Sequence, residues 1–122
     1  MATGTVTTVE ITHTSIKQVQ WDWLSTAGGA AGDTTTSYYN GRVISAVFEP
    51  DGGGTQPTDL YDVVVNDADG YDVLAGQGAN LSNAATVYKV EANLGAAGES
   101  KLTLSVTNAG NAKGGKVTLY IR

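Results

Sequence analysis

His13 is the only histidine of the chain, and it is the first residue to test for catalytic chemistry. A serine hydrolase needs a nucleophile, a histidine base and an orienting carboxylate in one constellation. Ser15 and Ser25 follow His13, but no nucleophile elbow surrounds either of them. Because no acid, base or nucleophile set meets the requirements of a catalytic site, we predict a non-enzymatic protein without catalytic residues.

The carboxylates are the second possible source of chemistry, since two of them at a suitable separation can hydrolyse a glycosidic bond. The chain has twelve Asp and Glu residues. Several of them stand in turn-like strings, as Asp51, Asp67 and Asp69 do. Asp favours turns because its side chain bonds the local backbone. We therefore interpret these three residues as turn residues.

The string at residues 66–70 is the best metal candidate. Asn66, Asp67 and Asp69 supply oxygen ligands before Gly70, as at the start of a calcium loop. The EF-hand pattern also requires a Glu at its twelfth position, and the first Glu after this string is Glu91. A hairpin turn explains the same residues without a metal. We therefore predict no metal ligands and no cofactor, and a calcium site at Asp67 and Asp69 is the minority alternative.

Two tryptophans raise the question of a binding surface. Trp21 and Trp23 are two residues apart and so share one face of a strand. On a solvent face they would form a sugar-stacking platform or an interface hot spot. Val19 has the same phase, which favours a buried core face.

Composition excludes several classes of partner. The chain has 122 residues, a net charge of −5 and only seven Lys and Arg residues, which are spread singly. Nucleic-acid binding and anionic membranes both require clustered positive charge, so we expect neither partner. No Cys is present, which removes disulfides and Cys-ligated zinc. The polar N-terminus lacks the pattern of a signal peptide, and we expect an intracellular product.

Short apolar-alternating runs separated by Gly, Asn and Asp clusters dominate the chain, and they predict strands. The segments with this character are residues 5–14, 16–24, 34–39, 42–48, 60–65, 71–74, 86–92, 101–107 and 116–122. The 16 Gly and two Pro agree with many turns and few helices. We predict an all-β fold of about eight strands, a single-domain antiparallel β-sandwich of jelly-roll or Ig-like type covering residues 1–122.

Details of the pairing follow from the turns. Asn40-Gly41 predicts a type I′ hairpin between residues 34–39 and 42–48. The last two strands predict another hairpin. In residues 86–92, alternation predicts Tyr88 and Val90 on the buried face. Residues 1–14 are expected to be an edge strand or an N-terminal arm, and residues 25–33 and 49–58 to be loops.

Three stretches resemble short proteins encoded among the structural genes of tailed bacteriophages. They are residues 54–63 (GTQPTDLYDV), 67–74 (DADGYDVL) and 117–122 (VTLYIR), and the likeness extends over most of the chain from about Trp21. The resemblance implies a head decoration (cement) protein, a virion component that assembles in the host cytoplasm. It implies a homotrimer that clamps adjacent subunits of the major capsid protein. No functional residue can be carried over.

The alternative function is a carbohydrate-binding or host-adhesion β-sandwich module. An exposed Trp21/Trp23 pair, with calcium near Asp67 and Asp69, would favour it. In either case the contact surface must be large, because a stable interface buries about 1,000 Å² or more. The N-terminal arm and the two loops are the predicted contact regions, since an extended arm can add a strand to a neighbour's sheet.

Overall fold

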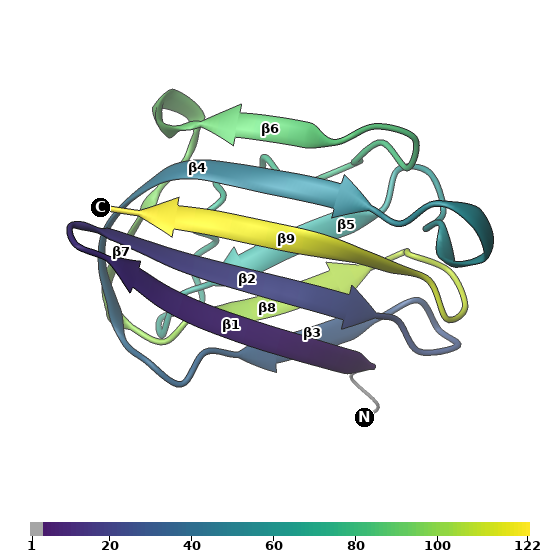
Figure 1. Ribbon diagram of the computed structural model, residues 1–122, viewed down its shortest axis with the longest axis horizontal. Coiled ribbons are helices and arrows are strands. Elements are labelled where there is room, and N and C mark those ends of the chain that lie inside the picture. The colour runs from purple at the N-terminus through teal and green to yellow at the C-terminus, as the bar shows by residue number, and fades with distance from the viewer. Residues whose placement is uncertain (1–3) are drawn as a thin grey trace.

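The chain folds into an antiparallel β-sandwich, as the sequence predicts (Figure 1). The structure is a computed structural model that describes residues 4–122. The first two strands, β1 (Thr5–His13) and β2 (Ile16–Leu24), form a hairpin. The remaining elements are β3 (Ala31–Thr34), β4 (Tyr39–Pro50), a 3₁₀ turn (Gly53–Thr55), β5 (Asp62–Asn66), β6 (Val87–Val90), a 3₁₀ turn (Glu91–Asn93), β7 (Ala96–Ser100), β8 (Thr103–Thr107) and β9 (Gly114–Ile121).

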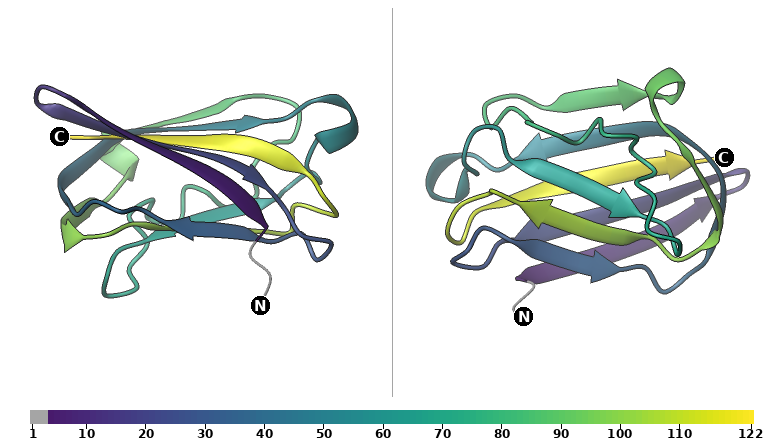
Figure 2. Two further views of the ribbon diagram at one scale, coloured as in Figure 1. Left: turned by 60° about the horizontal axis from the view of Figure 1, so that its bottom comes forward. Right: turned by 180° about the vertical axis from the view of Figure 1, so that it is seen from behind.

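Two sheets face each other (Figure 2). The larger sheet has the order β1-β2-β9-β4-β6, and β7 pairs with the first residues of β4. The smaller sheet has the order β3-β8-β5. The last two strands, β8 and β9, therefore belong to different sheets, and the predicted C-terminal hairpin is wrong. None of the helices in residues 4–122 is long and apolar enough to cross a bilayer.

The core lies between the two sheets and is built by strict alternation. Val19, Trp21 and Trp23 point inward from β2, and no more than 2% of any of them is exposed. The smaller sheet contributes Leu104 and Val106 from β8, which are fully buried. This confirms that the two tryptophans are core residues, and it removes the exposed aromatic platform that a sugar-binding module would use.

Gly115 shows why a small residue is needed opposite Trp23. These residues are paired across β9 and β2. A Cβ at Gly115 would lie 2.9 Å from Cζ2 of the Trp23 ring, which real Cβ contacts do not allow. The indole in turn packs against Tyr61, with ring centroids 5.7 Å apart. Burial and the charge of Asp51 raise the pKa of the Tyr61 hydroxyl to about 12.

The predicted hairpin at Asn40-Gly41 is also wrong. Residues 39–50 form one continuous strand, with a register shift at its start against β7. Gly41 does have positive φ (128°), but it lies at this register shift and not in a turn. A Cβ at Gly41 would collide with the carbonyl oxygen of Arg122. Gly in a strand often marks a bulge or a close backbone approach. A type I′ turn needs positive φ at both central residues, and of Asn40 and Gly41 only Gly41 has it.

Four further boundaries differ from prediction. Residues 71–74 form no strand and touch β5 mainly through an isolated bridge between Asn66 and Asp72. The predicted loop at 25–33 contains the start of β3, and β7 forms in residues 96–100, between two of the predicted strands. The predicted loop at 49–58 begins with the end of β4 and contains a 3₁₀ turn. Residues 5–13 form the edge strand β1, and residues 1–3 of the predicted arm lie outside the described residues.

Candidate assembly surface

Five strands lie side by side in the larger sheet (Figure 1). Its outward face carries two rows of side chains that cross these strands. Strand register and alternation define both rows. The first row is Val9, Gln20, Thr118, Val47 and Tyr88, in the order β1, β2, β9, β4, β6. The second row is Ile11, Gln18, Tyr120, Ser45 and Val90, in the same order. We call these ten residues the outer band.

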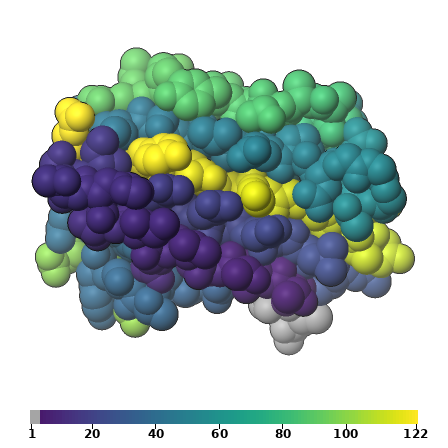
Figure 3. Space-filling view, in the orientation of Figure 1, coloured from purple at the N-terminus to yellow at the C-terminus, as the bar shows by residue number. Residues whose placement is uncertain are grey.

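The outer band is apolar at both ends. On β1, Val9 and Ile11 are 43% and 42% exposed, and on β6, Tyr88 and Val90 are 61% and 47% exposed. The predicted inward orientation of Tyr88 and Val90 is therefore wrong. Val87, one residue earlier, packs against the core instead. Figure 3 views this face, on which β1 is purple, β9 is yellow and β6 is green.

No charged residue belongs to the outer band, and charges begin only at its borders. Along one border lie Asp22, Lys116 and Glu49, which form the next row of the same sheet. At the other border Arg42 pairs with Glu91, with Nε 3.2 Å from Oε2. Depletion of charge, with Tyr and aliphatic residues retained, is typical of the buried core of a protein interface.

Glu10 fixes the strand that carries one end of the outer band. It lies between Val9 and Ile11 on β1 and points to the opposite side, toward the segment between β3 and β4. Its Oε1 accepts hydrogen bonds from the Tyr39 hydroxyl (2.7 Å) and the Ser37 N–H (3.1 Å). Its Oε2 accepts from the N–H (3.0 Å) and hydroxyl (2.8 Å) of Thr36. The carboxylate therefore holds β1 against the second layer.

These hydrogen bonds change the protonation of both partners. Burial alone would raise the pKa of Glu10, but the bonds from Tyr39, Thr36 and Ser37 outweigh burial and lower the pKa to about 2. Burial and the bond to Glu10 raise the pKa of the Tyr39 hydroxyl well above its usual range. Glu10 is therefore ionised at neutral pH, and Tyr39 donates to it.

The candidate calcium string is organised by hydrogen bonds within the protein. Oδ1 of Asp67 accepts the N–H groups of Asp69 and Tyr71, each at 2.9 Å, as turn-forming Asp residues do. Asp72 accepts the N–H groups of Val65, Leu74 and Gly76. Within residues 4–122, no three His, Cys, Asp or Glu side chains converge as metal ligands would. The turn interpretation of Asp67 accounts for this geometry.

The structure places His13 and Ser25 at opposite ends of the β1–β2 hairpin. The Nε2 atom of His13 lies 2.8 Å from Oε1 of Gln18 on the surface. The hydroxyl of Ser25 donates to the carbonyl of Gly110 and accepts the Lys113 N–H, which ties the end of β2 to the loop before β9. Ser25 and His13 therefore each have structural hydrogen-bond partners at separate places in residues 4–122.

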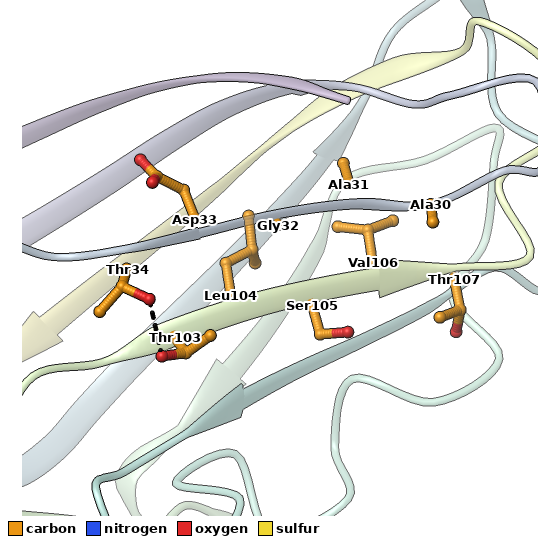
Figure 4. A pocket seen from close by; sticks show the side chains of 10 residues that line it. All are labelled: Ala30, Ala31, Gly32, Asp33, Thr34, Thr103, Leu104, Ser105, Val106 and Thr107. Carbon is orange, nitrogen blue, oxygen red and sulfur yellow. Dashed lines mark hydrogen bonds between the residues drawn. The ribbon is translucent and has the colours of Figure 1, made fainter. Parts of the chain in front are cut away.

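A depression of about 470 Å³ lies on the opposite side of the sandwich, over β3 and β8. Leu104 and Val106 are fully buried, so the depression opens on the outward face, where Ser105 and Thr107 point the other way (Figure 4). The hydroxyls of Thr34 and Thr103 bond across it at 3.0 Å. Its lining offers hydroxyl groups, backbone and the Asp33 side chain, and it contains no aromatic ring, which a binding pocket commonly has.

The alternation in β1 and β6 indicated that each strand has two different faces, but it did not show which of the two faces points to solvent.

Comparisons with protein families, with curated proteins and with solved structures give no match to this chain.

Proposed function

We propose that this chain is a non-enzymatic structural protein of a bacteriophage particle that decorates and stabilises the capsid by clamping adjacent capsid subunits. The observation that carries the proposal is the uncharged outer band, with its four exposed apolar side chains. These side chains form one apolar pair on β1 and one on β6, and the residues between them carry no charge, as in the charge-depleted core of a protein interface. The resemblance of residues 54–63, 67–74 and 117–122 to tailed-phage structural proteins supports a virion as the assembly.

The proposed partner is the major capsid protein, and the protein acts in the virion after assembly in the host cytoplasm. Self-association is part of the proposal, and the resemblance implies a trimer. A sandwich suits this role because its paired strands present a preorganised surface, which lowers the entropic cost of binding. The contact surface is then a sheet face rather than the arm and loops expected from the sequence.

The direct test combines solution mass with binding to purified capsid shells. We expect the wild-type chain to be oligomeric by light scattering and to co-sediment with shells. Val90→Lys places a charge in the outer band and is expected to weaken assembly. Tyr71→Lys is the matched control, because Tyr71 is 72% exposed but lies outside the band. A monomeric wild-type chain that stays in the supernatant would overturn the proposal.

The second candidate is a carbohydrate-binding or host-adhesion module. The depression over β3 and β8 favours it, because hydroxyls of Thr34, Thr103 and Ser105 can bond to a neutral sugar. The burial of Trp21 and Trp23 counts against it. A glycan array with the wild-type chain tests this role, and loss of a signal in Ser105→Phe would assign it to the depression. A blank array would eliminate it.

A further inference from the structure

The Asn40-Gly41 pair, which forms no turn, is a chemically reactive sequence. It lies in β4 at the register shift against β7, and the Asn40 side chain is exposed. The backbone nitrogen after an asparagine can attack the side-chain amide carbon and close a succinimide ring. Glycine at the second position favours this attack, because it has no side chain to hinder the approach. The ring is the intermediate through which asparagine loses its amide.

The peptide group that would act as the nucleophile is polarised by a cation. It consists of the carbonyl of Asn40 and the nitrogen of Gly41. The Nζ atom of Lys17 donates a hydrogen bond to this carbonyl oxygen at 2.6 Å. When the Gly41 N–H loses its proton, negative charge spreads onto the same oxygen. A charge-assisted hydrogen bond to the anionic form favours that form, so Lys17 promotes deprotonation of the nucleophile.

The amide that would be attacked is held by Glu99 at both of its polar atoms. The Glu99 N–H donates to Oδ1 of Asn40 at 2.6 Å. Negative charge develops on this oxygen as the amide carbon becomes tetrahedral, and a backbone N–H is well suited to stabilise it. Nδ2 of Asn40 donates to Oε1 of Glu99 at 2.7 Å. The carboxylate therefore lies beside the nitrogen that must leave, where it can relay a proton.

These three contacts reach one residue from strands that are distant in the sequence. Lys17 belongs to β2, Asn40 to β4 and Glu99 to β7. Figure 1 shows the start of β2, the start of β4 and β7 together at the end of the sandwich that holds the C-terminus. We propose that Asn40 is a self-modification site, at which Lys17 and Glu99 promote succinimide formation and deamidation.

The reaction needs only water as a co-reactant. The nitrogen of Gly41 forms a bond to Cγ of Asn40 and gives up its proton, while the Cγ–Nδ2 bond breaks. Nδ2 takes up one proton and leaves as ammonia. Water then opens the ring at either of its two carbonyl groups. The products are aspartate and isoaspartate in place of Asn40.

The modification changes the junction between β4 and β7. The new carboxylate cannot donate to Oε1 of Glu99, and it brings two negative charges into contact. Glu99 has a positive φ of 47°, which a non-glycine residue keeps only where its surroundings hold it. Its two hydrogen bonds with Asn40 are part of that support. Deamidation is therefore expected to loosen β7 from the start of β4.

The test compares the folded chain with the same full-length chain unfolded in guanidinium chloride. Both are incubated at neutral pH, and deamidation is located by peptide mapping with mass spectrometry. We expect Asn40 to react about fivefold or more faster in the folded chain, the rate equivalent of one exposed charge contact. Asn111, which is exposed and precedes an alanine, is the internal control and is expected to stay unmodified. A folded chain that reacts no faster would show that the contacts only protect the amide, and it would overturn the inference.

Two substitutions test the contacts separately. Lys17→Gln keeps a donor but removes the charge, and Glu99→Gln keeps an acceptor but removes the carboxylate. We expect each to slow the reaction in the folded chain and to leave the rate in the unfolded chain unchanged. Lys89→Gln is the matched control for charge, because Lys89 lies on β6 and the hydrogen bond to the Asn40 carbonyl comes from Lys17.

Near-ultraviolet circular dichroism checks that the three variants remain folded. An unchanged rate in Lys17→Gln or in Glu99→Gln would refute the assigned roles. Cleavage of the chain after Asn40 in place of deamidation would also refute them, since Nδ2 would then be the nucleophile and not the nitrogen of Gly41.

Discussion

Glu10→Gln is expected to destabilise the protein at neutral pH and to have no effect in strong acid. Each carboxylate oxygen of Glu10 accepts two hydrogen bonds. A glutamine presents an amide NH₂ at one of these positions, where it faces two donors. The buried Tyr39 hydroxyl or the N–H and hydroxyl of Thr36 would then lose their acceptor, and charge-assisted bonds are the stronger kind.

The magnitude follows from the pKa. A Glu10 pKa of about 2 in the folded chain, against the usual 4.5, corresponds to about 3 kcal/mol before solvent screening. Because the side chain is partly exposed, we reduce this to about 2 kcal/mol. The folded pKa lies below the unfolded one. The stabilisation is therefore complete above about pH 5 and is lost as the pH falls toward 2.

Urea unfolding of the wild type and Glu10→Gln at several pH values between 7 and about 2 measures this directly. We expect the two stability curves to differ by about 2 kcal/mol at pH 7 and to converge in acid. Glu91→Gln is the control, because its pair with Arg42 is about half exposed and such pairs contribute less than about 1 kcal/mol. Parallel curves for wild type and Glu10→Gln over the whole range would show that Glu10 does not hold β1 as argued.

Three further perturbations test the remaining geometry. Trp21→Ala is expected to cost about 3–5 kcal/mol in urea unfolding, because it opens a cavity at a fully buried position; a cost below about 1 kcal/mol would contradict the packing. Gly41→Ala is expected to cost more than about 1 kcal/mol, since the site has positive φ and touches a backbone carbonyl, whereas Gly54→Ala, with open space around it, is expected to be nearly neutral. Asp67→Ala is expected to lower the free energy of unfolding by about 1 kcal/mol, because two hydrogen bonds are lost. We expect added calcium or chelator to leave the melting temperature of the wild type unchanged. A rise of the melting temperature with calcium would restore the metal hypothesis.

The two tryptophans and the string around Asp67 show which features of the fold a local sequence pattern can predict. Trp21 and Trp23 were correctly placed in the core because Val19 shares their phase, and a half-buried strand has one apolar face. The string around Asp67 was correctly interpreted as a turn because its hydrogen bonds are local. Both inferences depend on residues within a few positions of one another.

The pairing of strands depended on distant residues and was only partly predictable. Asn40-Gly41 has the local signature of a hairpin, but the chain runs straight through it because β9 and β7 provide pairing partners for residues 39–50. The last two strands are adjacent in sequence, yet each has a better partner elsewhere. A turn signal permits a reversal, and the tertiary partners decide whether it occurs.

The sequence by itself determined the fold class, because it follows from composition and from period-two alternation. Only the tertiary structure decided which phase of β1 and β6 faces outward. On β1, Thr8 bonds to Asp33 of β3 and Glu10 bonds to residues 36–39, so Val9 and Ile11 face solvent. On β6, Val87 packs against the core and leaves Tyr88 outside. Alternation gives two faces to every strand, but the neighbouring layer selects the buried one.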